Sequence, residues 1–249
     1  MRLSRFFIDE TLSIGKSLEL PAHLVNYIVN VLRLKVGADL VLFNGQYYEQ
    51  YLGEFNATIT AISKRHCTIA ITAFTAKNIE SPIKTHLFQG ISRSERMDYT
   101  IQKAVELGIT HITPVFTQRS NLKKLNDKQL QKKMLHWQGV ATSACEQSGR
   151  SQLMVVNEPV SLKQINKFST ELNLLLSPTA KTSVADLKSM SASHINIFIG
   201  PEGGLSEAEI LYAKEQGYLD VSLGKRILRT ETAGLVMLTI LQFLWGDFS

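Results

Sequence analysis

The sequence has little of what marks secreted, metal-binding or membrane-spanning proteins. Only two cysteines occur, Cys67 and Cys145, and they lie too far apart for a disulfide framework or a cysteine-rich zinc site. The six histidines are scattered without the spacing of metal ligands, so we expect no metal held by the protein. No run of about 18 uncharged apolar residues occurs, which argues against a membrane span. The N-terminus reaches Asp9 and Glu10 before a signal-peptide core could form, so we expect a cytoplasmic protein.

The composition is that of an ordinary globular protein, with 44% apolar and 20% charged residues in a chain of 249. This length suits one large domain, or a small domain and a medium one. The net charge of +5 is compatible with a polyanionic partner without proving one. Basic residues crowd between Arg119 and Lys133 against a single acid, Asp127. This run fits a solvated helix face as well as a patch that binds a polyanion.

The N-terminal third is rich in β-branched and aromatic residues that are separated by turn signals such as Asn44-Gly45. Apolar residues at intervals of three and four predict one helix at 23–33. Strands are expected at 18–20, 39–43, 47–55, 57–62 and 67–72. We therefore predict a small β-barrel over residues 1–73, a plausible accessory binding module, followed by a linker at 74–82.

Beyond the linker, residues 83–249 alternate between strand and helix patterns. Strands are expected at 84–90, 109–116, 173–177, 195–200 and 220–224. Helices are expected at 96–108, 126–148, 206–217 and 231–243. Ser206 and Glu209 have the spacing of a capping box at the start of the third helix. This alternation predicts an α/β domain with a mainly parallel sheet.

Three loops of this domain have the composition of a ligand site, at 176–178, 200–205 and 223–232. Ligands gather at the carboxyl ends of parallel strands, and Gly203-Gly204 would let the backbone approach a ligand closely. Neither a dinucleotide fingerprint nor a P-loop is present, and Glu202 would repel phosphates. The loops therefore suit a ligand without phosphate, such as a cofactor with a sulfonium, a ribose and an adenine. The alternative is that the glycine turn is only structural.

The third loop places Arg226 and Arg229 just before an apolar helix. A purely structural interpretation makes Thr230 or Thr232 the N-cap, Glu231 an acid in the first turn, and the arginines surface residues. Taken alone, this interpretation is as good as a functional one. It loses ground because the Gly-Pro-Glu-Gly-Gly loop lies only about twenty residues earlier.

Two segments in this region resemble a known family. They are Ile-Gly-Pro-Glu-Gly-Gly-Leu-Ser at 199–206 and Leu-Gly-Lys-Arg-Ile-Leu-Arg-Thr-Glu-Thr-Ala at 223–233. They resemble the SPOUT superfamily of RNA methyltransferases and, more closely, the RsmE family, which methylates N3 of a uridine in 16S ribosomal RNA. Further matches at 31–37, 96–108 and 144–150 extend the resemblance over nearly the whole chain.

The resemblance implies an N-terminal PUA-like RNA-binding barrel and a C-terminal α/β domain with the SPOUT trefoil knot. It also implies a homodimer that acts on 16S rRNA, within the small subunit, with S-adenosyl-L-methionine as cofactor and no metal. The implied cofactor-binding residues are Leu176, Ser177, Pro178, Gly200, Pro201, Glu202, Gly203, Gly204, Leu205, Leu223, Gly224, Ile227, Leu228, Arg229, Thr230, Thr232 and Ala233. Ser177 and Lys225 depart from the family's usual histidine and proline. Because backbone groups do the binding there, we do not take these departures as a loss of activity.

The chemistry requires a group that accepts or disperses the N3 proton of uridine. We favour Arg229, which would stabilise negative charge on the uracil carbonyl oxygens, over Glu202 as a base. For Glu231, a helix N-terminal acid or a partner of Arg226 is the preferred interpretation. RNA contacts are expected from Arg2, Arg5, Arg33, Arg93, Arg119 and Arg150. Two alternatives stay open: a SPOUT enzyme for another rRNA or tRNA nucleotide, and a non-catalytic RNA-binding relative.

Overall fold

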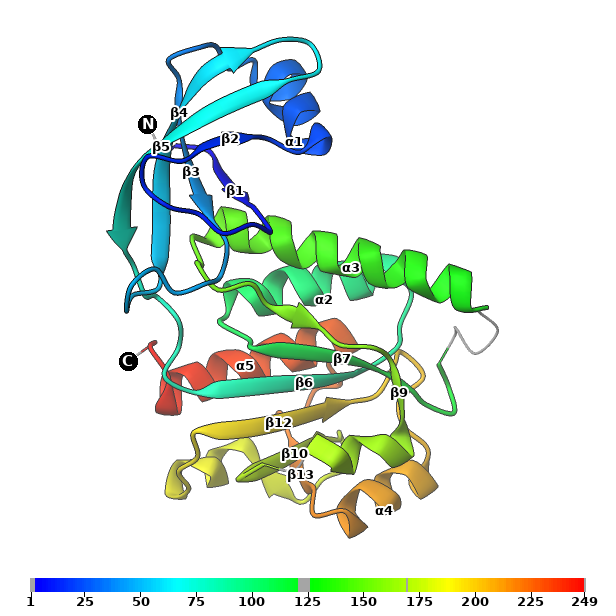
Figure 1. Cartoon of the computed structure of the whole chain (residues 1–249). Coiled ribbons are helices and arrows are strands. Elements are labelled where there is room, and N and C mark those ends of the chain that lie inside the picture. Colours follow the sequence, from blue (N-terminus) through cyan, green and yellow to red (C-terminus); the bar gives the residue numbers. More distant parts are fainter. Residues whose placement is uncertain (1–2, 121–125, 169, 249) are drawn as a thin grey trace. The chain divides into compact units, whose positions relative to one another are not determined.

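The computed structural model describes residues 3–120, 126–168 and 170–248 of the chain. The chain divides into two compact units (Figure 1). Unit 1 comprises Met1–Glu80 and Cys145–Leu153, and unit 2 comprises Ser81–Ala144 and Met154–Ser249. No helix within the described residues is long and apolar enough to cross a membrane.

Unit 1 is built on a five-stranded sheet in the order β1-β3-β4-β5-β2, in which β1 pairs with β3 in parallel and the other pairs are antiparallel. The strands are β1 (Arg5–Phe7), β2 (Ser17–Glu19), β3 (Asp39–Phe43), β4 (Gly53–Ile62) and β5 (Cys67–Ala76). Alternate residues of β4 are buried, as expected for a sheet with one face on a core. Leu40, Leu42, Phe55, Ile59 and Ile69 contribute to that core.

The predicted helix at 23–33 is present in two parts. A short helix α1 (Ala22–Asn26) continues as a π-helical segment η1 (Tyr27–Leu32). Arg33 ends it with a left-handed φ of 54°, a conformation that is uncommon outside glycine. Leu24 and Ile28 are buried, which is the apolar spacing that predicted the helix.

Unit 1 differs from the prediction at its boundaries. The predicted strand at 47–55 begins only at Gly53, because Tyr48 and Tyr51 pair with each other in a turn that has Glu49 at φ 55°. Strand β5 continues to Ala76, past the expected start of the linker at 74. The segment Cys145–Leu153, expected in the second domain, clusters with unit 1. None of these boundaries has a local sequence signal.

Unit 2 contains a parallel sheet in the order β11-β13-β10-β12-β6-β7-β8, with β9 paired to β7. Its strands are β6 (Lys84–Gly90), β7 (His111–Phe116), β8 (Val155–Val156), β9 (Val160–Ser161), β10 (Leu172–Leu176), β11 (Thr182–Ser183), β12 (His194–Ile199) and β13 (Leu219–Ser222). Its helices are α2 (Ser94–Glu106), α3 (Asp127–Ser148, whose last turn clusters with unit 1), α4 (Glu207–Glu215) and α5 (Thr230–Trp245), with 3₁₀ segments η2 (Leu162–Phe168) and η3 (Val184–Ser189). All five predicted strands and all four predicted helices are present. The two-residue strands and the 3₁₀ segments were not predicted from the sequence.

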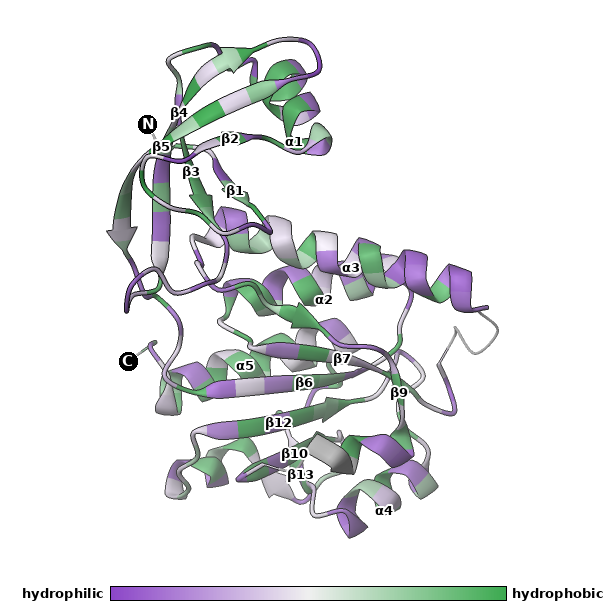
Figure 2. Ribbon diagram, viewed as in Figure 1, coloured by the Kyte–Doolittle hydropathy of each residue, from purple (hydrophilic) through white to green (hydrophobic). Residues whose placement is uncertain are grey.

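Both faces of the sheet in unit 2 are covered. Phe88 and Phe198 pack with Ala213 of α4 on one face. Their chain neighbours Leu87 and Ile199 point to the other face, where a β-carbon at Gly234 of α5 would meet them. Figure 2 shows α5 as largely hydrophobic, whereas the N-terminal turns of α3 are hydrophilic. The sheet is therefore buried on both sides, as parallel sheets usually are.

His86 of β6 is a partly buried polar group within this sheet. Its Nε2 lies 2.7 Å from Thr113 Oγ1, and its ring stacks on Phe88 with centroids 4.1 Å apart. Burial, and secondarily the nearby His111, lowers the pKa of His86 from 6.5 to about 3. The imidazole therefore stays neutral in the folded state over most of the acidic range.

We expect this partly buried histidine to make the protein less stable in mild acid. Between pH 6.5 and about 3, the unfolded chain binds a proton at His86 that the folded chain does not. Stability should therefore fall as the pH falls through this range, by at most about 1.4 kcal/mol per pH unit from this group. Urea denaturation between pH 4.5 and 7.5 should show a shallower pH dependence for His86→Gln than for the wild type. Equal slopes would contradict the assignment.

Candidate functional site

Three loops of unit 2 meet at one edge of the sheet. Strand β10 lies between β12 and β13, and both pairings are parallel, so the loops after the three strands leave the sheet on the same side. They enclose a cavity of about 470 Å³. Its lining residues are Arg96, Leu176, Ser177, Pro178, Thr179, Ile199, Gly200, Pro201, Glu202, Gly204, Leu205, Ile210, Val221, Leu223, Gly224, Arg226, Ile227, Leu228, Arg229, Thr230 and Ala233.

The structure brings together nearly all of the residues predicted from the sequence. Only Gly203 and Thr232 of the predicted cofactor set are not among the lining residues, and the Thr232 side chain is exposed. Six lining residues were not predicted for this set. They come from strands, from neighbouring helices or from the loops themselves. They are Arg96, Thr179, Ile199, Ile210, Val221 and Arg226.

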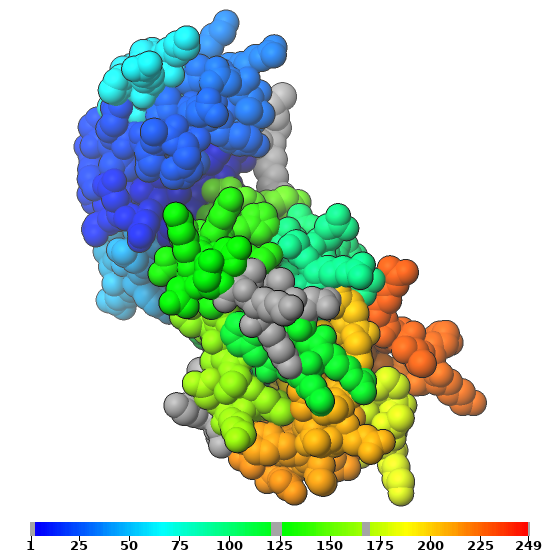
Figure 3. Space-filling model, turned by 90° about the vertical axis from the view of Figure 1, so that its right-hand side faces the viewer, coloured from blue at the N-terminus to red at the C-terminus, as the bar shows by residue number. Residues whose placement is uncertain are grey.

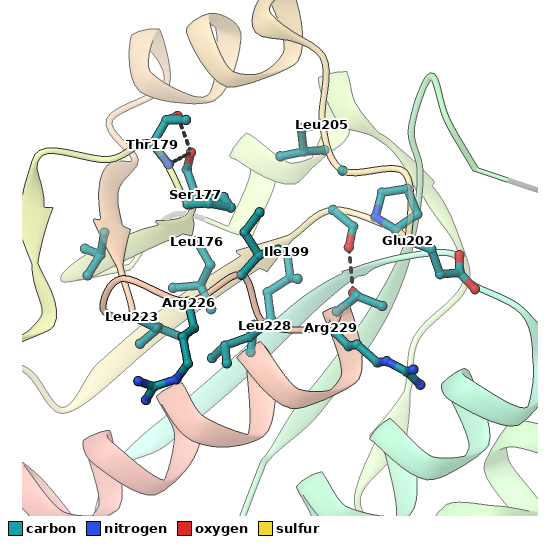
Figure 4. A pocket seen from close by; sticks show the side chains of 18 of the residues that line it. Leu176, Ser177, Thr179, Ile199, Glu202, Leu205, Leu223, Arg226, Leu228 and Arg229 are labelled. Atoms are coloured by element: carbon teal, nitrogen blue, oxygen red, sulfur yellow. Dashed lines mark hydrogen bonds between the residues drawn. The ribbon is translucent and has the colours of Figure 1, made fainter.

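The cavity has an apolar centre and a charged rim. In Figure 4 the side chains of Leu176, Ile199 and Leu228 face the same space, whereas Arg226 and Arg229 carry their guanidinium groups away from each other. The orange-red segment that includes the third loop projects from the right-hand edge of the molecule in Figure 3. Such a site can hold a flat apolar group in its centre and polar groups along the loop backbones.

The Gly200–Leu205 loop forms a tight turn. The Gly204 amide donates to the Pro201 carbonyl at 2.8 Å, and Gly204 has a φ of +69°, which favours glycine. Arg119 supports this turn from outside, because its Nη1 donates to the Gly203 carbonyl at 2.7 Å. The helix that follows has the predicted capping box between Ser206 and Glu209.

Thr230 joins two of the loops. Its hydroxyl donates to the Gly200 carbonyl at 2.6 Å and accepts from Gln89 Nε2 at 2.8 Å. The purely structural alternative, in which Thr230 or Thr232 caps α5, does not hold, because the N-cap is Arg229 and no side chain accepts a capping hydrogen bond. The buried Thr230 hydroxyl is occupied with holding the loop. Loss of this hydroxyl would leave the Gly200 carbonyl and the Gln89 amide without a partner, at a cost of about 1–3 kcal/mol.

Gly90, the last residue of β6, is a site residue that sequence reasoning missed. A β-carbon there would lie 2.5 Å from the Pro201 nitrogen and 2.7 Å from the Gly200 carbonyl carbon. Only glycine therefore lets β6 end against the Gly200–Leu205 loop. The one signal in the sequence is a glycine at the carboxyl end of a central strand.

Arg96, Glu202 and Arg229 line the cavity, and the buried Glu231 lies beside the two arginines. Arg96 Nε is 3.8 Å from Glu202 Oε1 and 3.9 Å from Glu231 Oε1. Arg229 Nη1 is 4.0 Å from the same Glu231 oxygen. Glu231 is in the first turn of α5, as predicted, but its ion-pair partners are Arg96 and Arg229, so the expected pairing with Arg226 is wrong. The sequence could not show this, because the partner comes from α2.

Two of the arginines predicted to contact RNA are structural. Arg5, which is 8% exposed, donates to Glu54 and to the Cys145 and Arg150 carbonyls. Arg150, which is 5% exposed, donates to Glu80 at 3.0 Å. Their guanidinium groups are committed inside unit 1, so the prediction of phosphate contacts by these two residues is wrong.

The other predicted RNA contacts are differently placed. The side chains of Arg33, Arg93 and Arg119 are exposed, although Arg119 also holds the Gly203 carbonyl. Arg2 lies outside the described residues, as do residues 121–125 of the basic run. In the described parts of the chain, no group of three or more His, Cys, Asp or Glu side chains is arranged to hold a metal ion.

The parallel sheet and the cavity enclosed by three adjacent loops are those of a methyltransferase domain of the SPOUT class. Family models match the chain as an RNA methyltransferase domain over residues 79–242 and an RNA methyltransferase PUA domain over residues 20–48. The chain belongs to this RNA methyltransferase family, together with proteins named ribosomal RNA small subunit methyltransferase E. One from Buchnera aphidicola is 34% identical over 100% of this chain and 99% of its own, and one from Bacillus subtilis is 29% identical over 97% and 96%.

Solved structures agree with this assignment. The ribosomal RNA small subunit methyltransferase E from Neisseria gonorrhoeae, bound to S-adenosyl methionine, has a TM-score of 0.87 at 35% identity over the full length of both chains. A Legionella pneumophila protein described as a methyltransferase in complex with the bound cofactor SAM has a TM-score of 0.92 at 36% identity, also over both full lengths. The predicted fold class is confirmed: a SPOUT-type, mainly parallel sheet domain preceded by a small PUA-like β domain.

Proposed function

We propose that this protein transfers a methyl group from S-adenosyl-L-methionine to N3 of a uridine in small-subunit (16S) ribosomal RNA. One observation carries the proposal: the loops at 176–179, 200–205 and 223–230 form a single cavity. The second and third of these loops belong to the segments in which the sequence resembles the uridine-N3 methyltransferases, and the resemblance implies the first as a cofactor loop. The names of the full-length relatives support the class of substrate.

The residues that line the cavity fit this cofactor. The cavity, at about 470 Å³, is in the size range of small-molecule sites. Leu176, Ile199 and Leu228 offer an apolar surface to an adenine ring, and the loop backbones offer hydrogen-bonding groups to ribose hydroxyls. Glu202 at the rim disfavours a phosphate but tolerates a sulfonium cation.

When bound, the cofactor supplies an electrophilic methyl group on sulfur. The protein's own part is to align the uracil N3 with that methyl group and to stabilise the charge that develops on the base. Alignment alone can supply much of the acceleration of such an in-line transfer. Arg229, with 76% of its side chain exposed, can reach a base in the cavity mouth and donate hydrogen bonds to a carbonyl oxygen.

We further propose that the protein acts in the cytoplasm as a homodimer, in line with the family resemblance. Arg33, Arg93 and Arg119 remain available as RNA contacts because their side chains are exposed. If they bind phosphates, RNA affinity will fall steeply as salt rises.

Mass spectrometry of ribosomal RNA from cells with and without the gene tests this function directly. The expected result is the loss of one N3-methyluridine from 16S rRNA on deletion and its return on complementation. An unchanged 16S profile with a missing modification in 23S rRNA or tRNA would refute the target and keep the enzyme class. Binding of S-adenosylmethionine without any lost modification would favour a non-catalytic RNA-binding protein.

A further inference from the structure

The ion pairs at the rim of the cavity are all long. The distances among Arg96, Glu202, Glu231 and Arg229 are 3.8, 3.9 and 4.0 Å, beyond hydrogen-bond range. The guanidinium and carboxylate groups therefore lie near each other without forming hydrogen bonds between them. Arg96 and Arg229 also line the cavity, and Glu231, which both arginines approach, is not itself among the lining residues.

Glu231 lies at the centre of this arrangement. Its Oε1 lies at nearly equal distances from Arg96 and Arg229. The residue is only 9% exposed, and its Oε2 accepts no hydrogen bond within the described part of the chain. A buried carboxylate oxygen without a donor is costly unless a ligand or water supplies one.

Glu202 has a different role, although its Oε2 is also unpaired. Its Oε1 accepts the backbone amide of Arg93 at 2.9 Å, at the N-cap of α2. This hydrogen bond ties the Gly200–Leu205 loop to α2 and so fixes the position of Glu202. Glu231, by contrast, is the acid placed between two arginines.

The order of these three groups matches one edge of uracil. The imide edge presents an acceptor, a donor and an acceptor: O2, N3–H and O4. Arg96, Glu231 and Arg229 present a donor, an acceptor and a donor. We infer that these three side chains recognise the imide edge of the target base, and that Glu231 accepts the N3 proton. This inference rests on the proposed function and adds Arg96 and Glu231 to its machinery.

The proton balance of the reaction is then complete. The N3 proton first passes to the Glu231 carboxylate and then to solvent. The in-plane lone pair that this leaves on N3 then forms the bond to the methyl group, while the methyl–sulfur bond breaks and its electron pair stays on sulfur. The same arrangement rejects cytosine, whose N3 has no proton for Glu231 and whose amino group would face a guanidinium. Leaving polar groups unpaired in this way gives strong discrimination.

The amino-acid end of S-adenosylmethionine is the competing ligand for these charges. Its ammonium could meet Glu231, and its carboxylate could meet Arg96 or Arg229. Measuring cofactor affinity and methyl transfer on the same variants distinguishes the target base from the amino-acid end of the cofactor. If the cluster recognises the base, its variants lose methyl transfer but keep their affinity for S-adenosylmethionine.

Glu231→Gln in the full-length protein is the first test, with the exposed Glu215→Gln of α4 as matched control. Calorimetry should give an unchanged Kd for S-adenosylmethionine in both variants. On small subunits purified from cells that lack the protein, Glu231→Gln should methylate about 10²- to 10⁴-fold more slowly at neutral pH. Its rate should then rise about tenfold per pH unit, because only the ionised base reacts without an acceptor. The wild type should show a shallower rise.

Arg96→Lys is the second test and keeps the charge while removing the planar fork. Its contacts with Glu202 and Glu231 are long, at 3.8 and 3.9 Å, and a lysine can keep the charge there. Relative to the wild type, kcat/KM should fall about tenfold to a hundredfold, again with unchanged cofactor affinity.

Three outcomes would count against the inference. A rise in the Kd for S-adenosylmethionine parallel to the loss of rate would assign the cluster to the cofactor. If the wild type methylates the RNA and both variants do so at the same rate, the inference is overturned but the proposed function stands. A wild type that methylates no uridine would overturn the proposed function as well. If Glu231→Gln fails to fold, the result with Arg96→Lys decides.

Discussion

Gly90→Ala is expected to weaken the binding of S-adenosylmethionine by about tenfold to a hundredfold. The new methyl group would lie 2.5 Å from the Pro201 nitrogen, and the neighbouring atoms are backbone or part of a proline ring. These atoms cannot move away by a change of side-chain rotamer, so the backbone of the Gly200–Leu205 loop must shift. Forced shifts of this kind typically cost about 1–3 kcal/mol, and each 1.4 kcal/mol is about tenfold in affinity.

Calorimetry with S-adenosylmethionine measures this effect, and thermal unfolding shows that the variant is folded. Gly139→Ala in α3 is the matched control, because a β-carbon there meets no atom within 4 Å. Alanine in a helix interior should stabilise that variant by about 0.5–1 kcal/mol. Normal cofactor affinity in Gly90→Ala would show that the loop tolerates the displacement, and that the close approach does not shape the cavity.

Arg229→Ala is expected to lower the rate of methyl transfer by about 10²- to 10³-fold, the usual cost of losing one donor to a developing oxyanion. Cofactor affinity should be nearly unchanged, because most of the side chain is exposed and its single ion pair with Glu231 is long. Single-turnover methylation of small subunits measures the rate, and calorimetry measures the affinity.

Lys214→Ala is the control for loss of one positive charge in unit 2. Lys214 pairs with Asp220 at the surface, and such pairs contribute little to stability. Its methylation rate should match that of the wild type. If Arg229→Ala retains full methylation with normal cofactor affinity, the role proposed for Arg229 in stabilising the base is excluded.

The parts of the fold that could be predicted are those with a local signal. The capping box of Ser206 and Glu209 follows from two residues three positions apart, and it is present. Alternation of apolar runs and amphipathic stretches predicted the strands and helices of unit 2. The topological rule that ligands lie at the carboxyl ends of parallel strands then placed three loops at one site, and they do line one cavity.

The errors concern contacts between distant segments. Arg5 and Arg150 are of the residue type that often contacts RNA. Both are buried, however, and bind partners up to 145 residues away, so their roles are structural. Thr230 has the position of an N-cap, but its hydroxyl binds a carbonyl 30 residues earlier. Arg96 gives no sign in the sequence that it meets Glu231. A side chain's type is visible in the sequence, whereas its partner depends on the finished fold.

The hydrogen bond from Gln89 to Thr230 closes a loop of 141 residues. Contacts so distant along the chain are entropically expensive to form and come late in folding. The Gly200 carbonyl depends on the same threonine, so the loop is secured only when α5 is in place. A ribosome that is still synthesising this protein therefore carries a chain with most of its sheet and no completed cavity. The ability to bind cofactor arises only once the start of the last helix has been synthesised and has docked.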